Sequence, residues 1–202
     1  MSATKETLFE YLEKDTEVLK SKLLSILAKQ SYKEGNFILA SGKESNYYID
    51  GKQTTLHAEG STIISILFLR MLKESIDAVG GMSVGADPLA SGVSQLGFLL
   101  KKNLHAFYVR KEPKKHGTSK WIEGPLKPGM KVAILEDVVT TGGSSIKAID
   151  KVQEFGCSVE QVLAMVDRKQ GGAEAFKEKG IEYTCIFDIN QIIEKYREDS
   201  SR

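Results

Sequence analysis

The sequence predicts an α/β fold, an open, twisted and mostly parallel sheet flanked by helices, with a small N-terminal hood. From about residue 60 onward, strand-like runs alternate with helical segments of roughly ten to fifteen residues, as in βαβ units. The continuous apolar runs "VAIL" at 132–135 and "VLAMV" at 162–166 suit strands that are buried on both faces. At 202 residues the chain has the length of one ordinary domain. We therefore expect a single domain over residues 1–202, with residues 1 to about 55 forming an N-terminal helix and the hood.

The individual elements follow from local patterns. Leucine and isoleucine recur at steps of three and four between residues 7 and 29, which predicts a helix. The segment "NFILASGKESNYYIDGK" at 36–52 has aromatic and β-branched clusters around Ser-Gly, which predicts a short hairpin or a pair of strands. Beyond it we expect helices at 61–77, 88–100, 144–155, 173–179 and 189–196, and strands at 82–84, 105–110, 131–138, 161–168 and 183–187. A polar loop occupies residues 111 to about 129.

Composition excludes several classes of protein. Lys and Arg number 28 against 27 Asp and Glu, so no overall positive charge favours nucleic acid or an anionic membrane as a partner. Cys157 and Cys185 lack the spacing of a zinc site or of a disulfide framework, and we expect both to be small buried hydrophobic residues. The N-terminus carries acids and no apolar signal segment, and no apolar run approaches the length of about 18 residues that spans a membrane. We expect a cytoplasmic protein.

The most informative stretch is "LEDVVTTGGSS" at 135–145, where an apolar strand ends in two acids and a string of hydroxyls and glycines. Ligands in open α/β sheets bind beyond the carboxyl ends of the strands. Residues 140–144 offer backbone amides at the start of a helix, which favours a phosphate. Glu136 and Asp137 then suit sugar hydroxyls or a metal held through water, so a phosphorylated sugar satisfies both halves. The alternative is an ordinary loop in which Ser144 caps the helix and the acids are exposed. The endings of a Walker A loop and of a dinucleotide fingerprint are both absent.

A second strand end, "VRKEPKKHG", is rich in cations. Like charges in one segment repel each other unless the segment contacts a highly charged anion such as a diphosphate. A solvated basic loop and a nucleic-acid patch are the alternatives, and the second is disfavoured because no aromatic residues interleave. The cationic residues are Arg110, Lys111, Lys114, Lys115, His116 and Lys120.

Other residues offer weaker signals. The pair Asp167-Arg168 ends another strand, where the guanidinium could bind a planar acid or form a structural ion pair. His57 and His105 flank predicted elements and are expected to be structural. No histidine has a metal-ligand partner at useful spacing, and no nucleophile with a base is legible, so covalent catalysis is not expected.

Taken together, these motifs resemble those of a known family. "VAILEDVVTTGGSS" resembles the phosphoribosyl diphosphate (PRPP) signature of type I phosphoribosyltransferases. "VRKEPKKHGTSKWIEG" resembles the mobile catalytic loop of the members that act on orotate, "FILASGKESNYYID" is similar to their hood, and "VGADPLASGVS" to their diphosphate loop. The resemblance covers residues 30 to 190, approximately. It implies transfer of the 5-phosphoribosyl group from PRPP to orotate, giving orotidine 5′-monophosphate and diphosphate in pyrimidine biosynthesis.

The resemblance also implies roles for individual residues. Glu136 and Asp137 would bind the ribose hydroxyls, residues 140–144 the 5′-phosphate, and the cationic loop the diphosphate. Catalytic roles fall to Lys114, His116 and Asp137. The implied PRPP contacts are Arg110, Lys111, Lys114, His116, Glu136, Asp137, Val138, Val139, Thr140, Thr141, Gly142, Gly143 and Ser144. Thr140 and Arg168, with the backbone around Tyr48 and Ile49, would contact orotate.

Cofactor and partners follow from the same resemblance. Mg²⁺ is implied, held by PRPP and water with no direct protein ligand, and so is a homodimer in which loop 111–120 reaches the neighbouring active site. Two departures stand out, because Ala40 and Leu89 occupy positions where some members carry lysine. A phosphoribosyltransferase for another nucleobase and a PRPP-binding regulator are the alternatives. The first is disfavoured by the hood, and the second by the absence of a basic DNA-binding segment.

Overall fold

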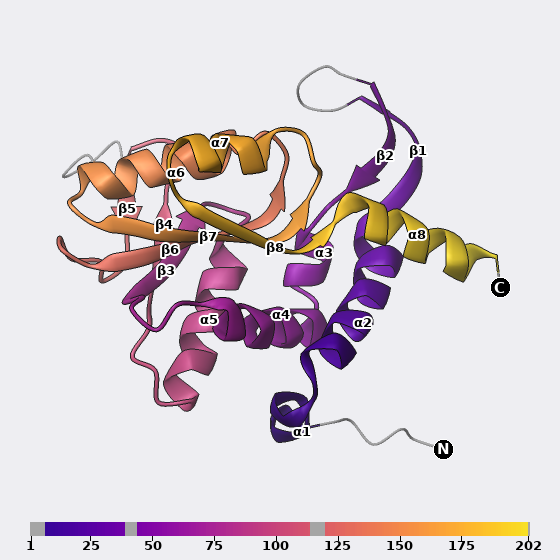
Figure 1. Cartoon of the computed structure of the whole chain (residues 1–202), viewed down its shortest axis with the longest axis horizontal. Coiled ribbons are helices and arrows are strands. Elements are labelled where there is room, and N and C mark those ends of the chain that lie inside the picture. Colours follow the sequence, from indigo (N-terminus) through magenta and orange to yellow (C-terminus); the bar gives the residue numbers. More distant parts are fainter. Residues whose placement is uncertain (1–6, 39–43, 114–119, 202) are drawn as a thin grey trace.

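A computed structural model describes residues 7–38, 44–113 and 120–201. The main sheet has six strands in the order β5-β4-β3-β6-β7-β8 (Figure 1). Strands β3, β4, β6, β7 and β8 are parallel, and the short β5 pairs antiparallel with β4 at one edge. A separate two-stranded antiparallel hairpin, β1-β2, projects beyond the sheet. The predicted fold class, a mostly parallel sheet flanked by helices with a small N-terminal hood, is confirmed.

The bounds of the elements are as follows. The strands are β1 Tyr32–Ile38, β2 Glu44–Ile49, β3 Ala78–Met82, β4 His105–Val109, β5 Ile122–Glu123, β6 Lys131–Val139, β7 Ser158–Asp167 and β8 Glu182–Asp188. The helices are α1 Leu8–Glu13, α2 Thr16–Ile26, α3 Lys52–Thr55, α4 Ala58–Met71, α5 Asp87–Leu99, α6 Gly143–Glu154, α7 Gly172–Glu178 and α8 Ile189–Ser200, with a π-helical turn, η1, at Leu27–Ser31.

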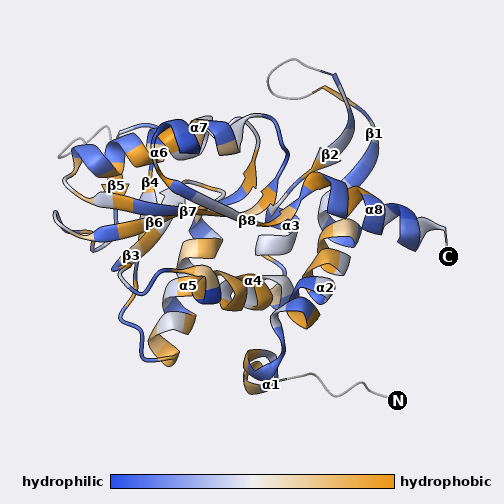
Figure 2. Cartoon of the chain, viewed as in Figure 1, coloured by the Kyte–Doolittle hydropathy of each residue, from blue (hydrophilic) through white to orange (hydrophobic). Residues whose placement is uncertain are grey.

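Helices cover both faces of the sheet, and β6 supplies both cores by alternation. Side chains of Ala133 and Leu135 belong to the core shared with α2, α4, α5 and α8. Val132 and Ile134 belong to the second core, shared with α6 and α7. Successive side chains of a strand point to opposite faces, which explains the division. Helix α4 is hydrophobic along most of its length, which suits its position in the core, where its residues 63 to 69 are buried (Figure 2).

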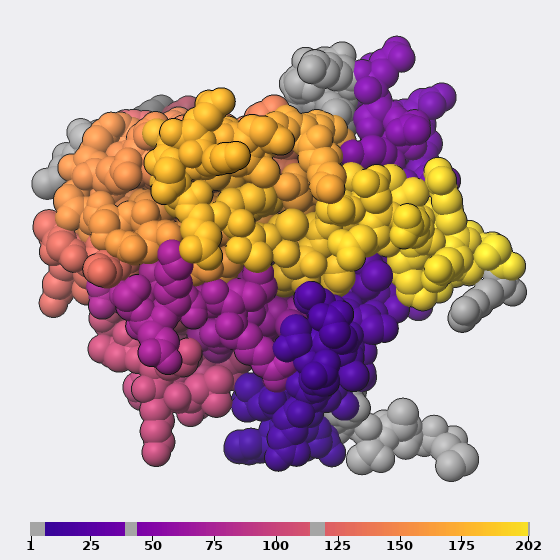
Figure 3. Space-filling model, viewed as in Figure 1, coloured from indigo at the N-terminus to yellow at the C-terminus, as the bar shows by residue number. Residues whose placement is uncertain are grey.

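The N-terminal segment and the C-terminal helix pack together. Helix α2 contacts both α4 and α8, and Figure 3 shows the first and last parts of the chain side by side. Leu19 and Leu23 of α2 are fully buried in the same core as Ile192 of α8. The hood is thereby held against the end of the sheet where β8 lies.

Four predicted elements differ from those observed. The helix expected at 7–29 is interrupted because Lys14 is extended and Asp15 caps a new helix through its bond to Glu17 N. The helix expected at 61–77 is α4, which begins earlier and ends at Met71. The strand expected at 82–84 is β3, which ends where the prediction began. The loop expected at 111–129 contains β5.

In the described part of the chain, no helix has the length and apolarity needed to cross a membrane. The carboxyl ends of β3, β4, β6 and β7 all lie at one edge of the sheet, because these strands are parallel and adjacent. This edge holds the candidate site.

Candidate active site

The turn from β6 into α6 forms an open pocket lined with backbone amides. Gly142 adopts a left-handed conformation, φ +79°, and precedes the first residue of α6. No side chain caps this helix, so Ser144 does not play the capping role that an ordinary loop would give it. The first N–H groups of a helix have no intrahelical partner and carry partial positive charge, which favours an anion. The pocket is lined by Glu136, Val138, Val139, Thr140, Thr141, Gly142, Gly143, Ser144 and Ser145.

The two acids of "LEDVV" have different surroundings. Glu136 lines this pocket and accepts a hydrogen bond of 2.7 Å from the Ser145 hydroxyl of α6. Asp137 is not among the residues lining the pocket, and its carboxylate instead accepts a bond of 2.9 Å from Val138 N. Because adjacent strand residues point to opposite faces, one sequence pair reaches two different surroundings. Both side chains are buried, at 7% and 8% exposure, so the alternative of an ordinary loop with exposed acids is wrong.

Two glycines leave room around Asp137. A Cβ atom on Gly51, next to the hood, would stand 2.9 Å from the Asp137 carboxylate. A Cβ atom on Gly85, in the turn after β3, would stand 2.7 Å from the other carboxylate oxygen. The hood and the turn after β3 therefore approach Asp137 closely. The charge of Asp137 also acts on Lys52. The hydrogen bond to Asp50 raises the pKa of Lys52, burial opposes the rise, and the charges of Asp50 and Asp137 add to it.

Burial and like charge change the protonation of Glu136. Removal from water, together with the neighbouring charge of Asp137, raises the pKa of Glu136 well above its usual range. The Ser145 hydroxyl opposes the rise by donating to the carboxylate. Raised carboxyl pKa values in a concave site are a mark of functional residues.

Arg168 lies beside the pocket at the start of α6, and one of its guanidinium nitrogens has no hydrogen-bond partner among the described residues. Its backbone N donates to Val139 O at 2.9 Å, which places it next to Thr140. Its guanidinium donates through Nε to the Tyr47 hydroxyl at 3.2 Å and lies 4.8 Å from the centre of that ring. The Nη2 atom is buried and has no hydrogen-bond partner in the described part of the chain. Asp167 binds the backbone N of Lys169 and forms no ion pair with Arg168 within the same described residues.

The cationic strand end is described in part. Arg110 forms an ion pair of 3.3 Å with Glu123 of β5, and the backbone O of Lys111 accepts a bond from Lys147. Residues 114–119 lie outside the described residues, so the predicted roles of Lys114 and His116 stay predictions.

Comparison with known proteins decides the family. No protein-family model matches the chain. An orotate phosphoribosyltransferase of Nostoc sp. is 44% identical over 185 residues, covering 91% of this chain and 90% of the relative. One of Synechocystis sp. is 46% identical over 177 residues, covering 87% and 89%. The chain belongs to the orotate phosphoribosyltransferase family. It is accordingly a pentosyltransferase of pyrimidine biosynthesis, with PRPP and orotate as its substrates.

A solved structure of this family shares the fold. The orotate phosphoribosyltransferase of Mycobacterium tuberculosis H37Rv in complex with PRPP superposes with a TM-score of 0.72 at 29% identity. The match covers 86% of this chain and 98% of that one. The predicted membership of the type I phosphoribosyltransferases is confirmed at the level of both sequence and fold.

The other residues that the sequence singled out for the site differ in how exposed they are and in where they lie. Tyr48 is exposed and makes a tilted ring contact with Phe37, whereas Ile49 is buried, so the side chains of Tyr48 and Ile49 leave β2 on opposite faces. Leu89 is a residue of α5 whose side chain is buried in the core, and Ala40 lies outside the described residues. No group of three or more His, Cys, Asp or Glu side chains among the described residues could hold a metal ion.

The histidines and cysteines that were expected to be structural differ in their contacts and in their burial. His57 caps α4 by accepting a bond from Gly60 N, and His105 begins β4. Both cysteines are free, but only Cys157 is buried, and Cys185 is half-buried.

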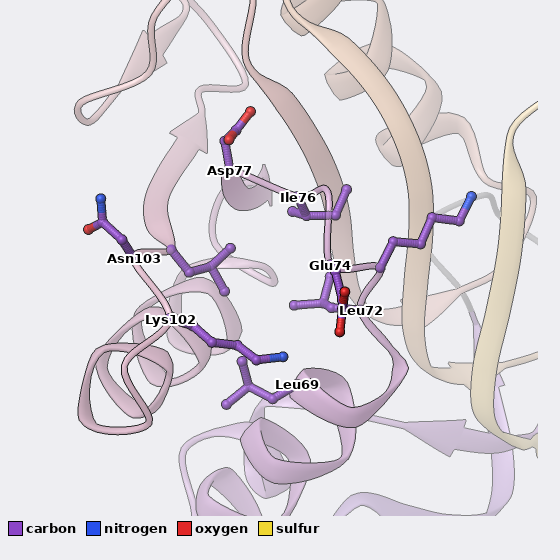
Figure 4. A pocket seen from close by; sticks show the side chains of 9 residues that line it. Leu69, Leu72, Glu74, Ile76, Asp77, Lys102 and Asn103 are labelled. Atoms are coloured by element: carbon purple, nitrogen blue, oxygen red, sulfur yellow. The ribbon is translucent and has the colours of Figure 1, made fainter.

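A second pocket lies at the opposite edge of the sheet. It is lined by residues before β3 and β4, with Leu69, Leu72 and Ile76 beside Lys102 and Glu74 (Figure 4). Its other charged groups already have partners, because Lys73 pairs with Glu182 and Asp77 accepts a bond from Lys131 N. Among the residues that the structure describes, the carboxyl edge is the one that combines an uncapped helix start with buried acids.

Sequence reasoning missed several residues of the orotate phosphoribosyltransferase site. Tyr47 contacts Arg168, Ser145 binds Glu136, and Gly51 and Gly85 adjoin Asp137. One signal was available for Tyr47, because alternate residues of "ESNYYI" place Tyr47 on the face of the buried Ile49. Contacts between residues 47 and 168, or 85 and 137, depend on the tertiary fold and leave no local pattern.

Proposed function

We propose that the pocket at the end of β6 performs the transfer of the 5-phosphoribosyl group from PRPP to orotate. One observation carries this assignment to the pocket: an uncapped helix start lies beside buried acids and beside a guanidinium with an unused buried N–H. These three features match the phosphate, the ribose and the acidic base. PRPP occupies the related enzyme of M. tuberculosis, which supports the same substrate here.

Different residues would bind the 5′-phosphate, the ribose and the diphosphate of PRPP. The amides of residues 140–144 would bind the 5′-phosphate, since this turn is open and positively polarised. Glu136 and Asp137 would accept hydrogen bonds from the ribose hydroxyls. Arg110, Lys111, Lys114 and His116 would face the diphosphate, which needs cations because it leaves with negative charge.

Orotate is a planar acid, and Arg168 suits it. A guanidinium binds a carboxylate with two parallel N–H groups, and Nη2 of Arg168 is the group left over. The contact with Tyr47 holds the guanidinium in place before orotate arrives. Thr140 lies next to it and can donate to the same base.

The chemistry follows from charge. Breaking the bond between ribose C1 and diphosphate builds positive charge on the ring, which the buried carboxylate of Asp137 would stabilise. Lys114 and His116 would stabilise the leaving diphosphate, with His116 able to donate a proton. The ring nitrogen of orotate then attacks C1. Mg²⁺, when bound with PRPP, would supply further positive charge to the diphosphate.

The assembly and location are proposed from the same resemblance. A homodimer would bring loop 111–120 of one subunit into the site of its partner. We also propose a cytoplasmic location.

The test is the loss of orotate absorbance when PRPP and Mg²⁺ are added to the purified chain. Adenine, hypoxanthine and uracil serve as alternative bases, and a chelator tests the metal. Consumption of orotate alone, abolished by the chelator, is the expected result. An unchanged orotate spectrum would overturn the proposal.

A further inference from the structure

Arg168 is the inner end of a row of ring contacts that reaches the C-terminal helix. Its Cζ atom lies 4.8 Å from the centre of the Tyr47 ring in β2. Tyr47 stacks on Tyr32 of β1, with 5.8 Å between the ring centres and 25° between the ring planes. Tyr32 meets Tyr196 of α8 edge to face, at 4.9 Å. These three tyrosines, the tyrosine row, therefore join the end of β7 to α8 across the hood.

Burial fixes the middle of the tyrosine row. Tyr32 is 3% exposed, and Tyr47 and Tyr196 pack against the same core. Aromatic rings whose centres lie about 4.5 to 7 Å apart attract each other beyond the effect of burial alone. Helix α8 lies beside the hairpin and contacts both η1 and β1 (Figure 1). Tyr196 is thus presented by an element that is itself anchored in the core.

A chain of polar contacts links the same two elements, but it lies in water. The Tyr32 hydroxyl donates to Glu34 at 3.4 Å, and Glu34 pairs with Arg197, whose side chain is 68% exposed. Exposed ion pairs contribute little, because water and salt screen them. The ring of Tyr196, rather than the charge of Arg197, is therefore the contact through which α8 holds Tyr32.

Arg168 depends on Tyr47 for its orientation. The guanidinium donates through Nε to the Tyr47 hydroxyl, at 3.2 Å, and lies on the same ring. Its Nη2 atom is buried and has no hydrogen-bond partner among the described residues, which leaves this group for the base. A hydrogen bond weakens steeply when its N–H group turns out of line. A tilt of Tyr47 would turn Nη2 away from the base.

We propose that Tyr196 of the C-terminal helix is a positioning residue of the base site, which fixes the guanidinium of Arg168 through Tyr32 and Tyr47. This inference rests on the proposed function, in which Arg168 binds orotate. Tyr196 itself touches no substrate in this scheme. Its effect is confined to the base, because the tyrosine row ends at Arg168 and includes none of the residues that line the pocket at the start of α6.

The test compares three variants of α8. Tyr196→Leu removes the ring and keeps an apolar side chain, whereas Tyr196→Phe keeps the ring and removes only the hydroxyl. Ile192→Val is the control, because Ile192 is fully buried in the same core and lies outside the tyrosine row. It measures what a general loosening of α8 does to the site. Circular dichroism and thermal unfolding establish that each variant is folded.

Steady-state kinetics give the first readout. We expect Tyr196→Leu to raise the KM for orotate by about two- to tenfold, the range expected for the loss of one aromatic contact. The KM for PRPP and kcat should stay within about twofold of the wild type, as should all three constants in Tyr196→Phe and Ile192→Val. An orotate KM raised by less than about twofold in Tyr196→Leu, or raised equally in Ile192→Val, would overturn the proposal.

A double-mutant cycle tests whether the effect passes through Arg168. In the Arg168→Gln background the tyrosine row no longer holds a guanidinium, so Tyr196→Leu should change the orotate KM by less than about twofold. A residue that merely stabilises the hood would raise the KM by the same factor in both backgrounds. That additive result would overturn the positioning role.

A second readout needs no turnover. Orotidine 5′-monophosphate and ribose 5-phosphate share a sugar phosphate, and only the first carries the base. Calorimetry should find that Tyr196→Leu binds orotidine 5′-monophosphate about two- to tenfold more weakly than the wild type, with ribose 5-phosphate within about twofold. Equal weakening of both ligands would overturn the proposal. A wild type that consumes no orotate refutes the proposed function, whereas an active wild type with an unaltered orotate KM in Tyr196→Leu refutes the positioning role alone.

Discussion

At the scale of single residues, the two neighbouring acids divide the site between two faces of one strand. Glu136 turns toward α6 and Ser145, whereas Asp137 turns toward the glycines of the hood and of the turn after β3. Burial, together with the neighbouring charge of Asp137, raises the pKa of Glu136 and favours a protonated Glu136 in the free protein. The free energy of unfolding should therefore depend on pH in part through Glu136.

Replacing Glu136 by Gln should flatten that dependence. Since the folded-state pKa of Glu136 is raised above its ordinary value of 4.5, the folded state holds a proton that the unfolded state releases. The stabilising contribution is complete below that ordinary value and is lost as the pH rises through the raised pKa. Urea unfolding from about pH 5 to about pH 8 should show the wild type losing stability relative to Glu136→Gln.

Glu178→Gln is the control for this experiment, because Glu178 is exposed on α7. It should follow the wild-type pH dependence. Equal slopes for the wild type and Glu136→Gln would mean that Glu136 is ionised in the folded protein.

Arg168 makes a separate prediction about substrate affinity. Arg168→Gln removes the unused N–H group and the contact with Tyr47, so the KM for orotate should rise by about tenfold or more, as expected for a lost charged hydrogen bond. The KM for PRPP should change by less than about threefold, since the phosphate pocket stays intact. Initial rates at varied orotate and varied PRPP separate the two effects.

Arg197→Gln provides the matched arginine control, because Arg197 of α8 forms an exposed ion pair with Glu34 of β1. It should leave both KM values unchanged. An orotate KM that is equal in Arg168→Gln and the wild type would remove Arg168 from the base site.

At the scale of elements, the start of α6 shows how a turn makes a binding site. Gly142 and Gly171 both precede helices, both have left-handed backbones, and neither helix has a side-chain cap. They differ in their surroundings, because a Cβ on Gly142 would stand 3.2 Å from the Phe176 ring, whereas one on Gly171 meets nothing within 4 Å.

This pair allows the conformational and packing costs to be separated. Gly171→Ala should lower the free energy of unfolding by about 1 to 2 kcal/mol, the cost of a left-handed alanine. Gly142→Ala should cost more, since Phe176 must also move, and it should weaken PRPP binding because the amides of residues 140–144 shift. Urea unfolding and calorimetric titration with PRPP measure the two effects. Equal PRPP affinity in both variants would contradict a phosphate pocket at this turn.

At the scale of the whole molecule, the sequence predicted the layers better than the contacts between them. The apolar runs at 132–135 and 162–166 predicted β6 and β7, since strands buried on both faces need continuous apolar residues. Strand β3 was misplaced because "AVGGM" contains two glycines, which weaken any strand pattern. The break at Lys14 was missed because the leucine spacing continues through it. Arg168 was found from its strand end, but its partner Tyr47 lies 121 residues away and only the fold joins them.

The proposed homodimer predicts that two defective variants can repair each other. Lys114→Ala should lower turnover by orders of magnitude without unfolding the chain, since it removes a cation from the leaving diphosphate. Asp137→Asn should also be defective, because it changes a side chain that is proposed to bind the ribose hydroxyls in the same site. If loop 111–120 serves the neighbouring subunit, a heterodimer of the two variants has one site with both defects and one with neither.

Mixing the two variants under conditions that exchange subunits should then restore activity. Random pairing gives heterodimers in about half of the dimers, each with one intact site of two, so about a quarter of wild-type activity should return. Light scattering checks that the mixture remains dimeric, and each variant incubated alone is the control. If the loop acts within its own subunit, each site is built from a single chain that carries one of the two substitutions. Every site then has one defect. Activity that stays at the level of the separate variants in a verified heterodimer would therefore place the loop in its own active site and remove the shared-site assembly.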